Sequence, residues 1–327
     1  MTTSATAFWV DRPGIGVLRT EDVSDPGPGE VLVRTVCTGI SRGTESLVFR
    51  GEIPSGEHER MRAPFQEGDF PGPVKYGYLN VGVVEGGGDG LRGHAVFTLF
   101  PHQSAFVVPE SAVTPIPEGV PARRAVLAGA VETAVNVLWD AAPLVGDSIT
   151  VIGAGMIGCS VARLARGIPG ADVVLVDVDR SRAAVCERLG VTYAHPDDAP
   201  LERSLVVDAS ASEEGLRLAL ASTVTEGEII VASWFGDRPV SLPLGGDFHS
   251  RRLTIRSSQV GMVSPRRRGS RTTRDRLSLA LGLLRDPAFD ALLTHSSSWR
   301  DLPAVMAAVA DGSSPGLCHT IDWKGAE

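Results

Sequence analysis

The clearest hydrophobic pattern lies near the middle of the chain, where two short runs flank a helical stretch. Residues 149–152 form the run Ile-Thr-Val-Ile, whose β-branched side chains suit a buried parallel strand, and a second run covers 173–176. Between the runs, apolar side chains recur at helical spacing at Ile157, Val161, Leu164 and Ala165. The pattern predicts a strand, a helix and a second strand in succession.

The same alternation continues toward the C-terminus. We expect a helix over 181–189, a strand over 205–208, a helix over 213–222 and a strand over 229–232. Strands that alternate with helices predict an α/β fold with a doubly wound parallel sheet. Ligands of such sheets lie across the carboxyl ends of the strands. Ser210 and Ser233 follow two of the expected strands, so we predict that they line a cofactor site.

The first 120 residues have a different pattern. Short strand-like runs at 29–36 and 81–85 are separated by clusters of proline and glycine, which is typical of an all-β module. The polar stretch from Gly51 to Tyr76 is long for a loop in a compact domain. We therefore expect either a lid or a disordered segment there.

Helical spacing returns at 121–141 and predicts a helix that connects the β module to the α/β region. Further helices are expected at 277–284 and 302–310, and a last strand at 317–321. A chain of 327 residues is long enough for two domains with sizeable cores. We place the boundary between them at residues 120 and 121.

The turn after the first run is rich in glycine. Gly153 permits a tight turn, Gly155 leaves room for a pyrophosphate, and Gly158 lets the following helix pack closely on the strand. The helix is expected to begin near Gly155, where the backbone N–H groups of its first turn, including Met156 and Ile157, would face the phosphates. The strands, the glycines and the helix occur in register, so we predict a dinucleotide-binding domain.

Asp177 ends the second run, nineteen residues beyond Gly158. A carboxylate at this place can accept both ribose hydroxyls and would repel a 2′-phosphate, so we predict NAD(H) as the cofactor. Arg180 and Arg182 follow closely, and Arg182 is a further candidate for contact with the cofactor. Because arginines here could also meet a 2′-phosphate, NADP(H) stays open as an alternative.

Composition excludes several functional classes. With 31 basic and 39 acidic side chains, the formal net charge is −8, which argues against nucleic acid or an anionic membrane as the main partner. The four cysteines are far apart, so neither a disulfide framework nor a cysteine-rich zinc site is expected. The chain shows no signal-like or membrane-spanning run, and we expect a cytoplasmic protein.

Nine arginines gather between residues 249 and 276 of this acidic chain. Such a charged run is usually a solvated surface. The alternative is that Arg251 or Arg252 lies near the cofactor and binds an anionic group of the substrate by a bidentate contact. That alternative predicts a polar or anionic substrate.

Several short motifs together carry a family resemblance. They are Pro-Gly-Glu-Val-Leu-Val at 28–33, Gly-Ile-Ser-Arg-Gly-Thr-Glu at 39–45, Gly-Tyr at 77–78 and Gly-Asp at 146–147. With these motifs the chain resembles the medium-chain dehydrogenase/reductase family, and the string at 41–45 is loosely similar to bacteriochlorophyllide dehydrogenases.

The resemblance implies a specific architecture. A GroES-like β-barrel substrate domain would cover 1–120 and be completed by 290–327, and a Rossmann NAD-binding domain would cover 121–289. The active site would lie in the cleft between the two domains, and Arg42 would contact the cofactor pyrophosphate. By analogy with the family, we expect a homodimer that acts on a small-molecule substrate.

The zinc ligands of the family are largely replaced in this chain. In zinc-dependent members a cysteine stands where Ser41 stands, a histidine where Tyr78 stands and a glutamate where Leu79 stands. Only Glu132 falls where polyol dehydrogenases use a glutamate ligand. Because a catalytic zinc needs about three protein ligands, we predict no metal.

Without a metal, hydrogen-bond donors must stabilise the developing oxyanion, and a proton must still move. Tyr78 is the candidate donor, and Ser41 or Thr44 is the candidate relay. Glu132 or Glu45 would be the base or the orienting group, since a carboxylate shielded from water can have its pKa raised toward neutrality. Each of these residues also has a purely structural alternative, because most buried polar groups are simply satisfied.

Three histidines are weaker candidates. His58 lies in the long polar stretch, His102 follows a proline in a strand-like run, and His249 precedes the arginines. Each could donate a proton near neutral pH, but we expect satisfied structural histidines.

These residues favour a zinc-independent oxidoreductase that transfers a hydride between NAD(H) and a secondary alcohol or ketone. Two alternatives stay open. The first is an NADPH-dependent reductase of an activated C=C bond, against which Asp177 counts. The second is a protein that binds NAD(H) without turnover, because fold analogy does not establish catalysis.

Overall fold

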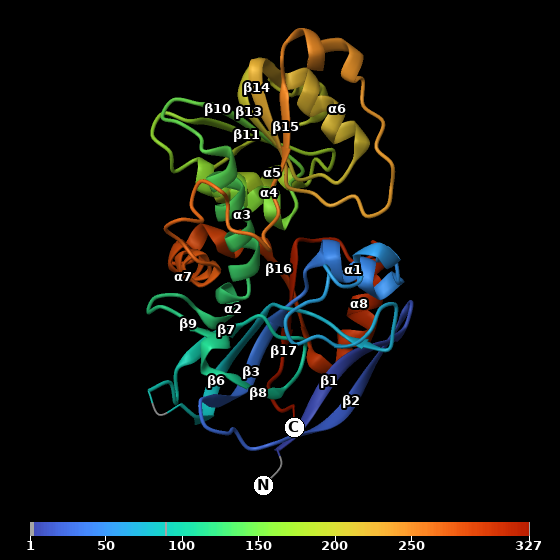
Figure 1. Ribbon diagram of the computed structural model, residues 1–327, viewed down its shortest axis with the longest axis vertical. Helices are drawn as coiled ribbons and strands as arrows, with labels where there is room; N and C mark the ends of the chain where they lie inside the picture. The colour runs from blue at the N-terminus through green and yellow to red at the C-terminus, as the bar shows by residue number, and fades with distance from the viewer. Residues whose placement is uncertain (1–2, 89, 327) are drawn as a thin grey trace. The chain divides into compact units, whose positions relative to one another are not determined.

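The computed structural model describes residues 3–88 and 90–326 and divides the chain into two compact units. The flanking unit comprises Met1–Gly129 with Leu293–Glu327, and the central unit comprises Ala130–Leu292 (Figure 1). The sequence pattern had placed the first boundary at 120 and 121. The residues up to Gly129 belong to the flanking unit, and the side chain of Leu79 lies directly against that glycine.

The central unit is built on a parallel sheet of six strands in the order β12-β11-β10-β13-β14-β15. The strands are β10 (Ser148–Ile152), β11 (Asp172–Val176), β12 (Thr192–Ala194), β13 (Arg203–Asp208), β14 (Thr223–Val231) and β15 (Thr254–Ser257). This is the order of a Rossmann sheet, and its direction of winding reverses between β10 and β13. The carboxyl ends of these two neighbouring strands are therefore the expected place for a ligand.

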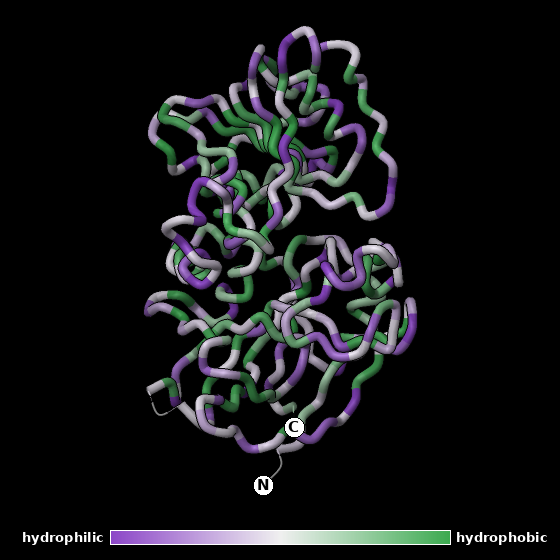
Figure 2. The backbone as a smooth tube through the Cα atoms, viewed as in Figure 1, coloured by the Kyte–Doolittle hydropathy of each residue, from purple (hydrophilic) through white to green (hydrophobic). Residues whose placement is uncertain are grey.

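Helices alternate with these strands, as the pattern predicted. They are α3 (Ala128–Ala141), α4 (Met156–Ala165), α5 (Arg182–Leu189), α6 (Glu213–Ser222) and α7 (Thr273–Leu283). One core cluster joins Val176, Val206 and Ile229 of the sheet to Leu216 of α6, and the strands stand out as a hydrophobic group in Figure 2. Because helices cover the sheet, its inner strands are apolar along most of their length.

Two strands of this sheet escaped the hydrophobic pattern. β12 has three residues, and β15 has Ile255 as its one apolar side chain. Both are edge strands of the sheet. An edge strand is covered by a neighbour on one side only and tolerates polar residues, so hydrophobicity does not mark it.

The flanking unit holds two sheets. One has the order β2-β1-β5-β4, and the other has the order β16-β17-β3-β6-β7-β9, with β8 paired to β3. The strands are β1 (Thr3–Arg12), β2 (Ile15–Val23), β3 (Glu30–Gly39), β4 (Glu67–Gly68), β5 (Val74–Lys75), β6 (Asn80–Gly87), β7 (Ala95–Thr98), β8 (Ala105–Pro109), β9 (Val113–Pro115), β16 (Leu293–Ser298) and β17 (Cys318–Asp322). The helices are α1 (Arg42–Arg50), α2 (Ala122–Ala125) and α8 (Leu302–Ala310).

The pairing in the flanking unit is mostly antiparallel. The C-terminal strand β17 lies antiparallel to β3, so the end of the chain joins the same sheet as the N-terminal motifs. The chain thus has a mainly antiparallel unit and a unit with a parallel Rossmann sheet, which confirms the predicted fold class. Among the described residues, no helix has the length and apolar character needed to cross a membrane.

The stretch from Gly51 to Tyr76 is folded, which corrects the expectation of a disordered segment. It contributes β4 and β5, and Lys75 at its end is only 1% exposed. The ammonium group of Lys75 binds Glu21 and Gln103 at 2.7 Å each and also pairs with Glu67. A buried ammonium needs such partners, and they attach the stretch to the strands around it.

Candidate functional site

The glycines of the turn after β10 serve different purposes, some in the fold and one beside a possible ligand. Gly153 has a φ of +98°, and a Cβ there would lie 2.7 Å from the carbonyl oxygen of Ala209. A Cβ on Gly158 would lie 1.9 Å from the carbonyl oxygen of Gly153. The fold itself therefore requires these two glycines. Gly155 has an ordinary φ of −76° and no heavy atom within 4 Å of its Cβ position, so the space beside it is open to a ligand.

Helix α4 begins at Met156, with Gly155 as its N-cap, as predicted. No side chain caps this end, and its first turn contains no acidic residue. The first backbone N–H groups, Met156 and Ile157 included, are thus left without an intrahelical acceptor beside the open space at Gly155. Such a helix end attracts anions, and its fit to a pyrophosphate is good.

Asp177 follows β11 and lies against the glycine turn. Its carboxylate accepts a hydrogen bond from the backbone N–H of Ala154 at 2.6 Å and another from that of Asp179 at 2.8 Å. Each carboxylate oxygen has a further lone pair that can accept a ribose hydroxyl. Arg182 pairs with Asp179 at 3.2 Å. The charge of Arg182 is therefore already balanced in part by a neighbour.

The two predicted serines lie at the carboxyl ends of their strands. Ser210 donates its hydroxyl to Asp208 at 2.6 Å, and Ser233 accepts from the backbone N–H of Ala211 at 2.9 Å. Burial raises the pKa of Asp208, and the hydrogen bonds from Ser210 offset this rise in part. Together with the glycine turn and Asp177, these residues gather at the switch point between β10 and β13.

In the flanking unit, the structure brings Tyr78, Ser41 and Thr44 together. The phenol of Tyr78 donates to the hydroxyl of Ser41 at 2.6 Å and also forms a hydrogen bond with Thr44. Burial, followed by the charge of Glu45, raises the pKa of Tyr78 to about 12, although the two hydroxyl contacts oppose this rise. Tyr78 therefore keeps its proton at neutral pH and acts as a hydrogen-bond donor.

Glu45 is 3% exposed and lies beside the hydroxyl cluster, which consists of Tyr78, Ser41 and Thr44. One of its carboxylate oxygens accepts the backbone N–H of Ser41 at 2.7 Å, and the other contacts Nε2 of His102 at 2.8 Å. Sequence reasoning had treated His102 as a satisfied structural residue. No spacing rule links positions 45 and 102, because the contact depends on how the sheet folds.

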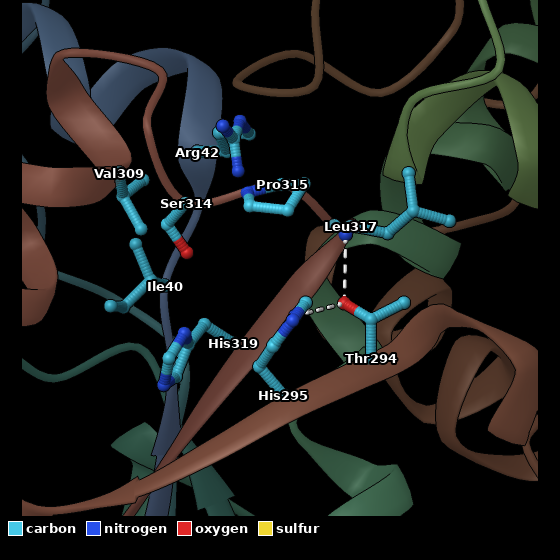
Figure 3. Close-up of a pocket in the computed structure, with 10 residues that line it drawn as sticks. Ile40, Arg42, Thr294, His295, Val309, Ser314, Pro315, Leu317 and His319 are labelled. Atoms are coloured by element: carbon cyan, nitrogen blue, oxygen red, sulfur yellow. Dashed lines mark hydrogen bonds between the residues drawn. The ribbon is translucent and has the colours of Figure 1, made fainter. Parts of the chain in front are cut away.

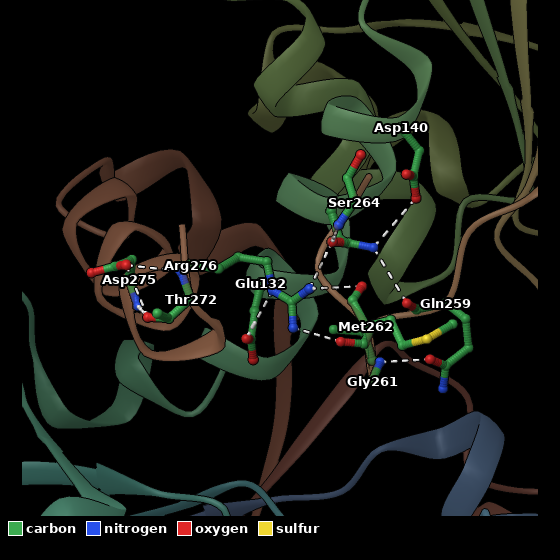
Figure 4. Close-up of polar contacts among 11 residues, drawn as sticks. Glu132, Asp140, Gln259, Gly261, Met262, Ser264, Thr272, Asp275 and Arg276 are labelled. Atoms are coloured by element: carbon green, nitrogen blue, oxygen red, sulfur yellow. Dashed lines mark hydrogen bonds and ion pairs between the residues drawn. The ribbon is translucent and has the colours of Figure 1, made fainter. Parts of the chain in front are cut away.

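Glu132 belongs to the central unit, not to the unit that holds the hydroxyl cluster. Its carboxylate accepts a hydrogen bond from Nε of Arg276 at 3.0 Å, and both side chains are buried (Figure 4). Arg276 also binds Asn136 at 2.6 Å and the backbone carbonyls of Val260 and Met262. The guanidinium thereby holds the loop after β15 against α3.

Arg42 begins α1 and lines a small pocket of the flanking unit (Figure 3). The rings of His295 and His319, which the sequence analysis did not single out, stack in this pocket with their centroids 5.6 Å apart. Burial and the neighbouring His295 lower the pKa of His319. The lowered pKa favours the neutral form of His319 at pH 7.

The arginine cluster does not supply the substrate contact that was considered for it. Arg251 binds the backbone carbonyl of Thr223, at the start of β14, and pairs with Glu202 at 2.9 Å. Arg252 pairs with Glu226 at 3.0 Å. Both arginines precede β15, which runs parallel to β14, so they lie at the amino ends of the strands. Ligands of such sheets bind at the opposite ends of the strands, the carboxyl ends. The arginines therefore give no argument for an anionic substrate.

All four cysteines are buried and unpaired. Within residues 3–88 and 90–326, no group of three or more His, Cys, Asp and Glu side chains has the arrangement to hold a metal ion.

The two units define a class of protein. A six-stranded Rossmann sheet with an open glycine turn, joined to an antiparallel unit of this topology, is the fold of the medium-chain alcohol dehydrogenases. Among solved structures, RspB from Escherichia coli CFT073, described as a short chain alcohol dehydrogenase in complex with NADH, has a TM-score of 0.78 at 16% identity and covers 98% of this chain and 100% of its own. A putative zinc-binding dehydrogenase from Sinorhizobium meliloti bound to NADP has a TM-score of 0.77 at 15% identity, with coverage of 98% and 100%.

Sequence comparison gives a particular relative. L-threonine 3-dehydrogenase from Deinococcus radiodurans is 26% identical over 226 residues, which is 56% of this chain. The matched segment spans 59% of the length of that relative. No family model matches the chain. These three similar proteins are described as dehydrogenases, and the two solved structures are complexes with NADH and with NADP.

Proposed function

We propose that this protein is a zinc-independent, NAD(H)-dependent oxidoreductase of the medium-chain dehydrogenase/reductase family that interconverts a secondary alcohol and a ketone. The observation that carries the proposal is the hydrogen-bonded cluster of Tyr78, Ser41 and Thr44. By the family resemblance, Ser41 and Tyr78 stand at positions where zinc-dependent relatives have metal ligands, and all three members of the cluster are proton donors.

The cluster supplies what the reaction requires from the protein. When bound, the nicotinamide ring supplies or accepts the hydride. Tyr78 donates to Ser41, and the hydroxyl proton of Ser41 is then left to donate to a substrate oxygen. The hydroxyl of Thr44 also forms a hydrogen bond with the phenol. A chain of hydroxyls can stabilise a developing alkoxide and pass a proton to it.

The protonated phenol of Tyr78 favours ketone reduction. At neutral pH the phenol is protonated, because its pKa is raised to about 12. An alkoxide is a stronger base than a phenolate, so proton transfer from Tyr78 through Ser41 to an alkoxide is downhill. Alcohol oxidation would need the phenolate instead, and it is therefore expected to become faster in alkaline solution.

Asp177 supports NAD(H) over NADP(H). Its carboxylate is held against the glycine turn by the N–H groups of Ala154 and Asp179, and a 2′-phosphate would meet a fixed negative charge there. For Glu132, we propose the structural role, because Arg276 already occupies its carboxylate. Contact of Arg42 with the pyrophosphate, the homodimer and the cytoplasmic location stay predictions.

The test is a titration of chelator-treated protein with NADH and then NADPH, followed by tryptophan fluorescence and melting temperature. Saturation at about 100 times Kd stabilises a fold by about 2.7 kcal/mol, which is readily seen. L-threonine, 2R,3R-butanediol and acetophenone, taken from the names of similar proteins, form the first substrate panel. Turnover that appears only after zinc is added would refute zinc independence, and a clear preference for NADPH would favour the C=C reductase.

A further inference from the structure

His102 is the point where the buried contacts around the hydroxyl cluster meet. The side chain is 1% exposed and lies in the segment between β7 and β8. Its Nδ1 contacts the hydroxyl of Thr38 at 2.7 Å, and its Nε2 contacts the carboxylate of Glu45 at 2.8 Å. Both ring nitrogens are therefore engaged.

One arrangement of protons satisfies every member of this chain of contacts. The indole N–H of Trp323, which can only donate, binds the Thr38 hydroxyl oxygen at 3.0 Å. Thr38 can then donate to Nδ1 of His102, and the Nε2–H of His102 donates to Glu45. The other oxygen of Glu45 accepts the backbone N–H of Ser41. The chain thus runs from the C-terminal segment to the start of α1.

The imidazole also packs on the segment between β5 and β6, which carries Tyr78. A Cβ placed on Gly77 would lie 3.0 Å from Cδ2 of His102, so the ring rests directly against the Gly77 backbone. His102 consequently contacts a neighbour of each member of the Tyr78–Ser41 pair: Glu45, which accepts the Ser41 N–H, and Gly77, which precedes Tyr78.

We propose that His102 is a positioning residue of the active site, which fixes the Ser41 hydroxyl relative to the phenol of Tyr78. This inference rests on the proposed function and names a residue that acts through Glu45 without touching the substrate. Burying a histidine and a carboxylate costs desolvation energy, and an apolar pair of similar volume would serve packing equally well. The polar His102–Glu45 pair is instead explained by its role in orienting the Ser41 hydroxyl.

The test compares His102→Gln with His102→Asn. Glutamine can place its amide N–H near the Nε2 position and keep the contact with Glu45, whereas asparagine can keep only the contact with Thr38. Each variant loses one hydrogen bond, so their melting temperatures should fall by similar amounts. Gln103→Ala is the control for stability, because its side chain is equally buried and binds Lys75 instead.

The primary readout needs no substrate. The chain has three tyrosines, so a 13Cζ-tyrosine label gives few signals, and Tyr78→Phe assigns the one of interest. Exchange of the Tyr78 hydroxyl proton should accelerate about tenfold or more in His102→Asn, since a hydrogen bond to a charged group is lost. It should stay close to the wild-type rate in His102→Gln and in Gln103→Ala. With an accepted ketone, kcat should fall in His102→Asn while the KM for NADH stays unchanged.

Equal exchange rates in the glutamine and asparagine variants would overturn the inference, as would a slow rate in both despite a lowered melting temperature. If neither variant folds, Thr38→Val tests the same chain from the other ring nitrogen. It removes the contact with Nδ1 and leaves that of Nε2 with Glu45, so the exchange rate should stay close to the wild-type rate, and a rate about tenfold faster would overturn the inference. Because the exchange readout is independent of turnover, a wild-type protein inactive on every ketone refutes the proposed function without deciding the role of His102.

Discussion

Tyr78 donates its phenolic proton to the hydroxyl of Ser41 at 2.6 Å, and both side chains belong to the flanking unit. The contact joins the segment before β6 to the residue before α1. Two sequence positions 37 residues apart thus form one donor unit. The contribution of each residue at or near this contact can be tested by substitution.

Replacing Tyr78 with phenylalanine removes the hydroxyl and keeps the ring. We expect kcat for ketone reduction to fall by about a hundredfold or more, which is the usual contribution of a positioned proton donor. NADH affinity should be unchanged, because the glycine turn belongs to the other unit. Tyr76→Phe is the matched control, since its phenol binds the carbonyl of Met61 and its ring contacts that of Tyr78. Equal losses in the two variants would contradict the assignment.

Glu45→Gln should lower the pKa of Tyr78 from about 12 toward 10, because the negative charge of Glu45 is the second cause of the rise, after burial. The sign follows from electrostatics, since a nearby anion disfavours phenolate. Tyrosinate absorbance, measured against a Tyr78→Phe reference, reports the change. The pH at which alcohol oxidation accelerates should move down with it. An unchanged pKa would mean that Glu45 does not act on the phenol.

Asp177 should control the choice of cofactor. Asp177→Ala is expected to weaken NADH binding by about ten- to a hundredfold, because hydrogen bonds to a charged group are lost. The difference in affinity between NADH and NADPH should become smaller. Asp177→Asn separates charge from shape, since its amide oxygen can still accept the Ala154 N–H that the carboxylate accepts now. Isothermal titration with both cofactors gives the comparison. If NADH and NADPH weaken equally in the alanine variant, Asp177 only shapes the turn.

The Glu132–Arg276 pair predicts a stability effect. Arg276→Ala leaves Glu132 buried without its cation and should cost about 3–5 kcal/mol of unfolding free energy. Burial raises the pKa of Glu132 despite the opposing effect of Arg276. Folding is therefore favoured below the unfolded pKa of this group, and that contribution is lost as the pH rises through the folded value.

Glu132→Gln removes this titration and keeps the shape of the side chain. The melting temperature of the variant relative to the wild type should therefore rise as the pH increases from acid toward neutral. Thermal unfolding across that range measures the difference. A difference that falls with pH would show that the ion pair outweighs the desolvation of the carboxylate.

How much the sequence predicts depends on the kind of contact. Strong local patterns predicted β10, the glycine turn, α4 and Asp177, because each follows from neighbouring residues. Edge strand β15 was missed since it buries little apolar surface. The contact of Glu45 with His102 and that of Glu132 with Arg276 join positions far apart in the chain, and no periodicity reports them. The position of Arg251 could not be predicted for a similar reason. It lies at the amino end of β15, and the hydrophobic pattern does not mark this strand.

The burial of Lys75 makes this chain unusual as a target for amine chemistry. The sequence contains two lysines, Lys75 and Lys324, and Lys324 is exposed while Lys75 is enclosed by carboxylates and an amide. An acylating reagent should therefore label the Lys324 side chain first and reach Lys75 only when β1, β2 and β5 separate. The rate of labelling at Lys75 thus becomes a clock for local opening of the flanking unit.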